Sequence, residues 1–198
     1  MTSSDADAAL MRRVGDGDRD AFRELVERYQ RVVIRTIYRS LGDAWEAEDL
    51  AQRVFVQVYR SANRYRPTAK FTTWLFTIVH NTILNEHRRR RRHAAESLDA
   101  LQQPDPGGES GGWQPADLRA PDPAQAAALR ELHEQIGAAI RELPPQQRTA
   151  VILCRFEGQS YEEIAATLGC SVPAVKSLLH RARVTLTERL KPFLPGGV

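Results

Sequence analysis

Residues 160–181 read SYEEIAATLGCSVPAVKSLLHR, which is the pattern of two short helices joined by a tight turn. Ser160 and Glu163 have the spacing of a capping box at the start of the first helix. Gly169 tolerates the left-handed backbone that such a turn needs. Ser171 is a preferred residue for the cap of the second helix. The stretch therefore predicts a helix-turn-helix.

The second helix of this predicted motif has an apolar face and a basic face. Ala165 supplies the small residue where the helices cross, and Val175 and Leu178 face the first helix. The residues expected to project away from the core are Lys176, Ser177, His180 and Arg181, with Arg183 extending the basic face. A plain helical hairpin with solvated cations is the alternative. The coincidence of capping box, glycine and basic face favours a recognition helix in the major groove of DNA.

A second basic feature lies in the first half of the chain, where Arg88–Arg92 are five consecutive arginines. Alone, this run is typical of a solvated helix end, where cations favour the negative pole of the helix dipole. Asn85 and Asn81 precede it by one and two turns, however, and four aromatic residues lie further upstream: Tyr65, Phe71, Trp74 and Phe76. Stacking rings, base-reading amides and phosphate-binding cations together predict binding of single-stranded DNA. We expect Trp74 to be at least partly buried.

Apolar residues recur at helical spacing along both halves, and strand patterns are absent. Gly42 is expected to end one helix, and Asp43 with Glu46 has the capping-box spacing that starts the next. Pro144 and Pro145 are expected to interrupt the helices of the second half, which restart at Gln146 and break again at Gly158. The fold class predicted is all-α, with two small helical domains.

The composition, with 42% apolar and 27% charged residues among 198, is that of a globular protein. No stretch is long and apolar enough for a membrane span, and the N-terminus lacks the pattern of a signal peptide, so we expect a cytoplasmic protein without membrane insertion. The two cysteines match no metal-ligand pattern, so we expect neither a disulfide framework nor a metal, and no cofactor.

Charge and composition divide the chain into blocks. Residues 1–93 and 128–198 are net basic, whereas residues 94–127 carry one arginine against six carboxylates. This middle block is rich in proline and glycine, and its apolar residues show no helix or strand periodicity. It therefore cannot bury enough apolar surface to fold. The boundaries predicted are a flexible N-terminus over 1–17, a domain over 18–93, a disordered linker over 94–127, a helix-turn-helix domain over 128–191 and a tail over 192–198.

Four segments together resemble the extracytoplasmic-function (ECF) group of bacterial RNA polymerase sigma factors. They are AEDLAQRVFVQVYR, FTTWLFTIVHNTILNEHRRRR, LPPQQRTAVILCRFEGQSYEEIAATLGCS and VKSLLHRAR. The resemblance covers about residues 18–92, which are similar to sigma region 2, and residues 128–190, which are similar to region 4.

The resemblance implies a role for each segment. The loop over residues 63–70 falls where the family captures a flipped base of the −10 element, and the following helix falls where it reads further bases. The −10 residues implied are Asn63, Arg64, Tyr65, Lys70, Asn81, Asn85, Arg88 and Arg89. The −35 residues implied are Lys176, Ser177, His180, Arg181 and Arg183.

The resemblance also implies docking on core RNA polymerase, through the coiled coil of its largest subunit and the flap region. The residues in the corresponding segment are Asp49, Leu50, Gln52, Arg53 and Phe55. Arg53 departs from the family pattern, which has an acidic residue there in many members. An anti-sigma factor is a further partner that the resemblance implies.

Two alternatives belong to other classes. A regulator that uses only the helix-turn-helix would bind a palindrome as a dimer without polymerase. A nucleic-acid enzyme would need clustered carboxylates or an activated nucleophile, and the acidic group Glu46, Glu48 and Asp49 has no second carboxylate group near it in sequence. We therefore expect a transcription initiation factor without enzymatic activity.

Overall fold

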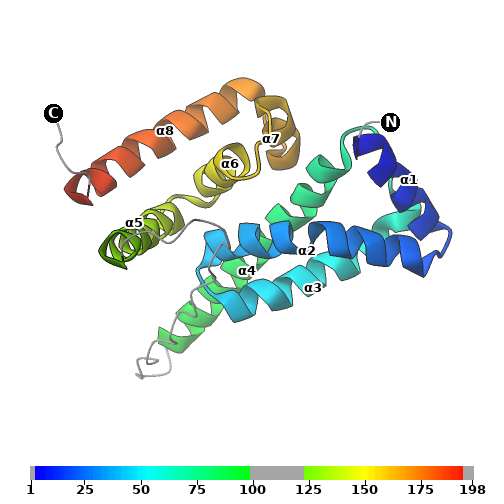
Figure 1. The fold of residues 1–198 in the computed structure, drawn as a ribbon, viewed down its shortest axis with the longest axis horizontal. Helices are drawn as coiled ribbons and strands as arrows, with labels where there is room; N and C mark the ends of the chain where they lie inside the picture. Colours follow the sequence, from blue (N-terminus) through cyan, green and yellow to red (C-terminus); the bar gives the residue numbers. More distant parts are fainter. Residues whose placement is uncertain (1–2, 99–122, 194–198) are drawn as a thin grey trace.

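The computed structural model describes residues 3–98 and 123–193, and in these ranges every regular element is helical (Figure 1). The all-α prediction is confirmed. None of the helices in these ranges is both long and apolar enough to cross a membrane. The elements are α1 (Ser3–Gly15), α2 (Arg19–Leu41), α3 (Ala44–Ser61), the 3-10 helix η1 (Ala62–Arg64), α4 (Phe71–Leu98), α5 (Pro123–Arg141), α6 (Pro145–Arg155), α7 (Tyr161–Leu168), α8 (Val172–Leu190) and the 3-10 helix η2 (Lys191–Phe193).

Helices α2, α3 and α4 form a bundle whose ends are fixed by local chemistry. The Asp18 carboxylate caps α2 by accepting hydrogen bonds from the backbone N–H groups of Asp20 and Ala21 at 2.9 and 3.0 Å. Gly42 ends α2 with φ +84°, where glycine is favoured. Asp43 then caps α3 by accepting from Glu46 N, as the sequence predicted. The Glu46 carboxylate instead pairs with Arg90 of α4.

Helix α1 differs from the sequence prediction, which placed residues 1–17 in a flexible segment. Leu10, Met11 and Val14 are buried against the bundle. The buried carboxylate of Asp7 accepts hydrogen bonds from the Arg28 guanidinium and the Tyr29 hydroxyl. Burial, followed by this contact with Asp7, raises the pKa of Tyr29. Residues 3–15 are thus an integral part of the first half of the fold.

Helices α5 to α8 make up the second half, with a small core of their own. Ile140, Leu143, Val151, Ile152 and Ala182 form this core. Pro144 separates α5 from α6, and Gly158 lies in the connection between α6 and α7, as the sequence predicted. Pro144 and Gly158 thus each lie in a turn between two helices. Pro145, expected in the interruption, is instead the first residue of α6, where its missing N–H costs no hydrogen bond.

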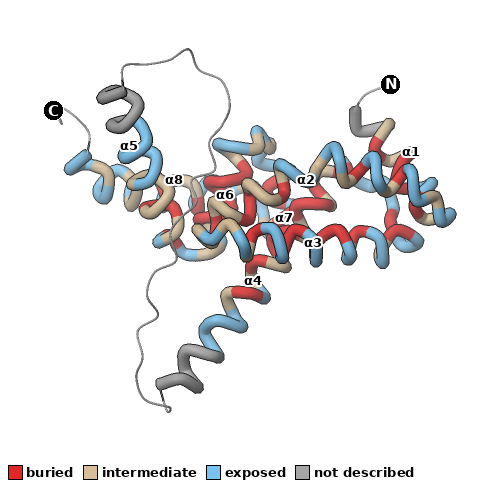
Figure 2. The backbone as a smooth tube through the Cα atoms, turned by 60° about the horizontal axis from the view of Figure 1, so that its bottom comes forward, coloured by how far each residue is buried: buried red, intermediate tan, exposed pale blue. Residues whose placement is uncertain are grey.

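The two halves pack directly on one another. Helices α5 and α6 contact α2, and α7 contacts α4. Leu153, Ile164 and Val175 of the second half belong to the same buried cluster as Leu25 and Leu75 of the first. Buried segments accordingly continue from one half into the other (Figure 2).

The predicted linker over 94–127 is partly described. Its two ends are helical, because α4 continues to Leu98 and α5 begins at Pro123. Residues 99–122 lie outside the described ranges, as do residues 194–198 of the predicted tail.

The burial of α1 generates a prediction about stability. Met11 is fully buried, so Met11→Ala should lower the free energy of unfolding by about 2–5 kcal/mol. Urea denaturation followed by circular dichroism measures this value. A decrease below about 0.5 kcal/mol, as for an ordinary surface change, would mean that α1 does not pack on the bundle.

Candidate nucleic-acid interface

Helices α7 and α8 form the helix-turn-helix that the sequence predicted. Ser160 Oγ accepts from Glu163 N at 3.2 Å, and Ser160 N donates to a Glu163 carboxylate oxygen at 2.7 Å, which completes the capping box. Gly169 has φ +63° and ends α7. Ser171 caps α8 by accepting from Ala174 N. Local sequence alone therefore sets the turn between the two helices.

The two faces of α8 also agree with the prediction. Val175 and Leu178 are buried against the cluster that contains Ile164 and Ala165 of α7. The five predicted −35 residues, Lys176, Ser177, His180, Arg181 and Arg183, are all exposed. Arg183 lies at the edge of this face, where it lines an apolar groove between α6 and α8 with Leu179 and Leu186.

Asn81 and Asn85 are exposed and line a groove between α3 and α4. The groove has a volume of about 640 Å³, and Asp49, Gln52 and Arg53 of α3 line its other wall. The sequence assigned the asparagines to DNA and the α3 residues to polymerase. The structure brings the two sets together on opposite walls of one groove.

The five arginines of α4 divide into two groups. Arg89 is held by Glu86 through contacts of 2.7 and 2.9 Å, and Arg90 contacts Glu46 and Glu86. Glu86 is buried, so these two arginines serve to neutralise it. The others, Arg88, Arg91 and Arg92, line a shallow hollow together with Asn85. Arg88 is therefore placed to make the predicted DNA contact, whereas the guanidinium of Arg89 is held by Glu86.

The aromatic residues are mostly core. Trp74 is half-buried and Phe76 is buried, which confirms the expectation for Trp74. Tyr65, predicted to contact the −10 element, is only 6% exposed and packs edge-on against Trp74, with 5.0 Å between ring centroids. Burial raises the pKa of its hydroxyl. In this arrangement Tyr65 supports the loop and presents no open stacking surface.

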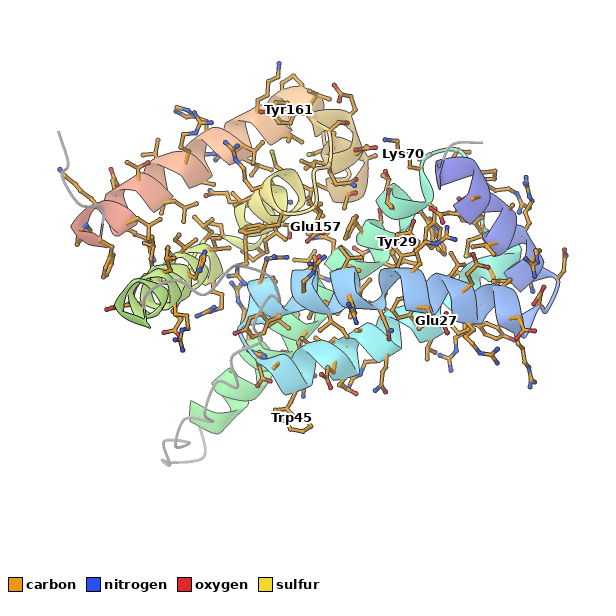
Figure 3. All side chains as sticks on the ribbon, viewed as in Figure 1. Glu27, Tyr29, Trp45, Lys70, Glu157 and Tyr161 are labelled. Atoms are coloured by element: carbon orange, nitrogen blue, oxygen red, sulfur yellow. The ribbon has the colours of Figure 1, made fainter. Side chains whose placement is uncertain are left out.

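The rest of the loop over residues 63–70 is exposed, including Asn63, Arg64 and Lys70. Lys70 reaches the second half of the molecule, where its Nζ lies 2.7 Å from a carboxylate oxygen of Glu163 (Figure 3). Burial alone would raise the pKa of Glu163, but the contacts with Lys70 and Ser160 hold it below its usual value.

The predicted polymerase-docking residues separate in the same way. Leu50 and Phe55 are buried and anchor α3 in the bundle, so their side chains face inward. Asp49, Gln52 and Arg53 are exposed. The unusual Arg53 pairs with Asp49 one turn earlier, at 2.7 Å.

Sequence reasoning missed an exposed aromatic residue beside this docking segment. Trp45, at the start of α3, is 85% exposed and projects away from the bundle (Figure 3). Trp45, Asp49, Gln52 and Val56 follow one another at spacings of four, three and four residues, so they form a single exposed stripe on α3. This spacing was the signal that could have identified the stripe.

The turn between α7 and α8 generates a prediction. Because a left-handed conformation strains residues with a Cβ, Gly169→Ala should destabilise the fold by roughly 1–2 kcal/mol. Gly169→Asn is the matched control, since asparagine tolerates this conformation better. Thermal unfolding of both variants checks the ranking, and an alanine variant as stable as the wild type would contradict the turn described.

The sequence of the chain matches two known protein families. "Sigma-70 region 2" matches residues 25–93, and "Sigma-70, region 4" matches residues 133–186. The RNA polymerase sigma-H factor of Pseudomonas aeruginosa is 35% identical over 98% of both chains. The ECF RNA polymerase sigma-E factor of Escherichia coli is 33% identical over 98% of this chain and 99% of its own. The ECF sigma factor SigE of Mycolicibacterium smegmatis is 40% identical over 84% of this chain and 60% of its own.

Solved structures show the same fold. CnrH, in complex with the cytosolic domain of CnrY, matches with a TM-score of 0.65 and 26% identity over 94% of this chain and 98% of its own. The sigma factor RpoE of Bartonella quintana, in complex with the anti-sigma factor NepR, matches with a TM-score of 0.66 and 27% identity over 86% of this chain and 96% of its own. With both regions in order and relatives of this identity along nearly the whole chain, the protein belongs to the ECF RNA polymerase sigma factors.

Proposed function

We propose that this sigma factor directs transcription initiation through three exposed faces, one for each contact it must make. Core RNA polymerase would dock on α3, the −10 element on α4 and the preceding loop, and the −35 element on α8. The observation that carries the proposal is the presence, on one chain, of a basic recognition helix and a separate helix that combines amides with cations. Its place of action would be the cytoplasm, where polymerase and promoter meet.

The −35 contacts would come from the exposed face of α8. Lys176, His180 and Arg181 offer hydrogen-bond donors that match guanine edges and phosphate oxygens in the major groove. The buried face of the same helix is anchored by Val175 and Leu178. A recognition helix fixed in this way gives up little conformational freedom when it binds.

The −10 contacts would come from Asn81, Asn85 and Arg88. Opening a duplex costs a few kcal/mol of free energy per unstacked base. A protein that hydrolyses no nucleotide must offset this free energy by binding the separated strand. The amides can read base edges from the α4 wall of the groove, opposite the α3 residues assigned to polymerase. The hollow lined by Arg88, Arg91 and Arg92 is suited to the phosphates that follow.

Polymerase docking would use the stripe on α3 that runs from Trp45 to Val56. Asp49 and Gln52 lie between two apolar residues, of which Trp45 is 85% exposed. An exposed tryptophan beside polar groups is typical of a binding hot spot. The apolar groove between α6 and α8 is the corresponding candidate for the flap region.

An anti-sigma factor is the further partner that we propose. CnrH and RpoE were each solved in a complex, one with the cytosolic domain of CnrY and the other with the anti-sigma factor NepR. A helical inhibitor that covers α3 or α8 would block the faces assigned above.

Run-off transcription with purified core polymerase on genomic fragments tests the proposal. We expect discrete start sites that appear only when the chain is added, each preceded by two dissimilar elements. Protection of a palindrome by the chain alone would instead identify a regulator that acts without polymerase.

Arg181 generates the first prediction about DNA. If it reads a base through two hydrogen bonds, Arg181→Ala should weaken promoter binding by about 1–3 kcal/mol, with the effect concentrated on particular −35 sequences. Holoenzyme binding to a panel of −35 substitutions measures this effect. Equal weakening on every sequence would reduce Arg181 to a phosphate contact.

Substitutions of Asn81 and of Trp45 together distinguish base recognition from docking on core polymerase. Asn81→Ala should reduce transcription from duplex promoters but leave core binding intact, and a pre-melted −10 region should restore part of the activity. Trp45→Ala should instead weaken core binding, by about 2 kcal/mol or more if it is a hot spot. Loss of core binding in the Asn81 variant would contradict the assignment of Asn81 to bases.

A further inference from the structure

Helix α1 has no role in any of the three proposed faces. It lies across the end of the bundle, where it contacts α2, α4 and η1 (Figure 1). The residues Asn63 and Arg64 of η1 are also the first residues of the loop over 63–70, which we assign to the −10 element. A helix without an assigned role thus packs against the loop that would bind an extruded base.

The end of α1 lies close to the start of this loop. A Cβ atom at Gly15, the last residue of α1, would lie 3.4 Å from the backbone oxygen of Ala62 and 3.4 Å from Oδ1 of Asn63. Ala62 is itself buried, whereas Asn63 is exposed. Because glycine has no side chain, α1 approaches η1 closely here. The place of Asn63 therefore depends on where α1 ends.

The beginning of α1 is fixed by a buried carboxylate. Asp7 is 2% exposed and accepts hydrogen bonds from the Arg28 guanidinium and the Tyr29 hydroxyl, both on α2. The apolar residues of α1 already hold it on the bundle, and burying a charge adds a desolvation cost that an apolar residue would avoid. What the carboxylate adds is direction, because hydrogen bonds restrict the angles at which their partners meet. Asp7 therefore fixes the orientation of Tyr29.

Tyr29 connects this carboxylate to the loop (Figure 3). The centroid of its ring lies 5.1 Å from that of Phe71, the first residue of α4. Phe71 in turn lies 6.2 Å from Tyr65 and 5.8 Å from Trp74, and the rings of Tyr65 and Trp74 are 5.0 Å apart. These are the distances of favourable aromatic pairs. Tyr65 lies within the loop and Phe71 directly follows it, so the ring bonded to Asp7 belongs to a cluster that holds the loop on both sides.

Tyr65 depends on these rings for its position. Its hydroxyl is buried and has no hydrogen-bond partner among the described residues, so no polar contact of its own side chain fixes it. Burial and then the charge of Asp7 raise the pKa of Tyr65, and the charge of Arg12 opposes the rise. Two charged residues of α1 therefore lie near the Tyr65 ring. The packing of Tyr65 is thus sensitive to the placement of α1.

We propose that α1 positions the loop over residues 63–70, and that Asp7 is the positioning residue, acting through Tyr29 and the aromatic rings on both sides of the loop. This inference rests on the proposed function, since it concerns the loop assigned to the −10 element. Asp7 is too buried to touch DNA. Its effect is to hold the loop in one arrangement, in which exposed side chains such as Asn63 meet the extruded base.

Positioning of this kind acts on selectivity. Hydrogen bonds to a base edge need fixed distances and angles. A loop that samples several arrangements therefore binds the preferred base less tightly, in proportion to the time it spends in the competent one. Binding of an abasic strand changes little, because phosphate contacts carry no base information. A role in stability alone would instead weaken all contacts of the chain together.

Two substitutions in the full chain test the proposal. Tyr29→Phe keeps the ring and removes only the hydroxyl that Asp7 binds, and Asp7→Ala removes the carboxylate. Glu24→Gln is the matched control, because Glu24 is the other carboxylate that contacts Arg28, at 2.6 Å, but is 51% exposed and lies on α2 itself. Circular dichroism reports whether each variant is folded. If Asp7→Ala is unfolded, Tyr29→Phe decides alone.

The measurement is equilibrium binding by holoenzyme, assembled from each chain and core RNA polymerase. The probe is fork-junction DNA made from a promoter that run-off transcription has identified. Its single-stranded −10 segment carries each of the four bases, or an abasic site, at one position at a time. Affinity for core polymerase and selectivity for substituted −35 elements are measured with the same chains.

We expect the wild type and Glu24→Gln to bind the preferred base, at the position that the loop contacts, about tenfold more tightly than an abasic site. Tyr29→Phe and Asp7→Ala should lower this ratio to about threefold, as for a loop that is competent about a third of the time. Selectivity at the −10 positions read from α4, selectivity for −35 sequences and affinity for core polymerase should stay unchanged.

Three results would overturn the proposal. Full selectivity in either folded variant would show that the contacts from Asp7 through Tyr29 are not needed. An equal loss on every probe and in core binding would reduce Asp7 to a role in stability. The same loss in Glu24→Gln would trace the effect to Arg28. In each case the wild type still selects a base, so the proposed function would stand. A wild type that distinguishes no base at any −10 position would refute the proposed function of the loop, and this inference with it.

Discussion

Arg148 brings a positive charge into a space nearly closed to water, and its contacts join three helices from both halves of the molecule. It donates to carbonyl oxygens of Ser40 and Leu143 and lies against His87. Burial, together with the nearby Arg141, lowers the pKa of Arg148. A buried charge is tolerated only where such partners are fixed, so the placement of α6 on α2 and α4 is tightly specified. The positions of α7 and α8 follow from that of α6.

The same interaction relates stability to function. Helix α8 is oriented by α7, and α7 rests on α4, which carries the amides and arginines of the other reading face. The exposed residues of α4 and of α8 are anchored by buried residues that belong to one cluster spanning both halves. The relative position of the faces depends on this cluster and on the polar contacts that Arg148 and Glu157 make with α2.

Local signals in the sequence predicted much of the fold and of the helix-turn-helix. Ser160 with Glu163, and Gly42 and Gly169, act through bonds to residues close in sequence, so their roles can be read from spacing alone. The same holds for the exposed face of α8, which follows from helical period once Val175 and Leu178 are placed inside.

Long-range contacts explain what the sequence did not reveal. Met11 and Asp7 hold α1 on the bundle through partners that are distant in sequence, and nothing near residue 10 signals them. Tyr65 has the aromatic character expected of a base-stacking residue, yet its ring is buried against Trp74. The pairing of Glu157 with Arg39 joins residues 118 positions apart. Composition and periodicity carry no information about such pairs.

A single intramolecular distance tests the central claim, which is that the contacts of Arg148 hold the two halves of the free chain together. Dyes placed beside Asn81 on α4 and beside Lys176 on α8 allow energy transfer to be measured on single molecules of the free chain, in the wild type and in the Arg148→Ala variant. The account predicts a short distance, within about 50 Å from helix rise and chain extension, in the wild type and a longer distance in the variant. A long distance in the wild type, or the same short distance in the variant, would contradict it.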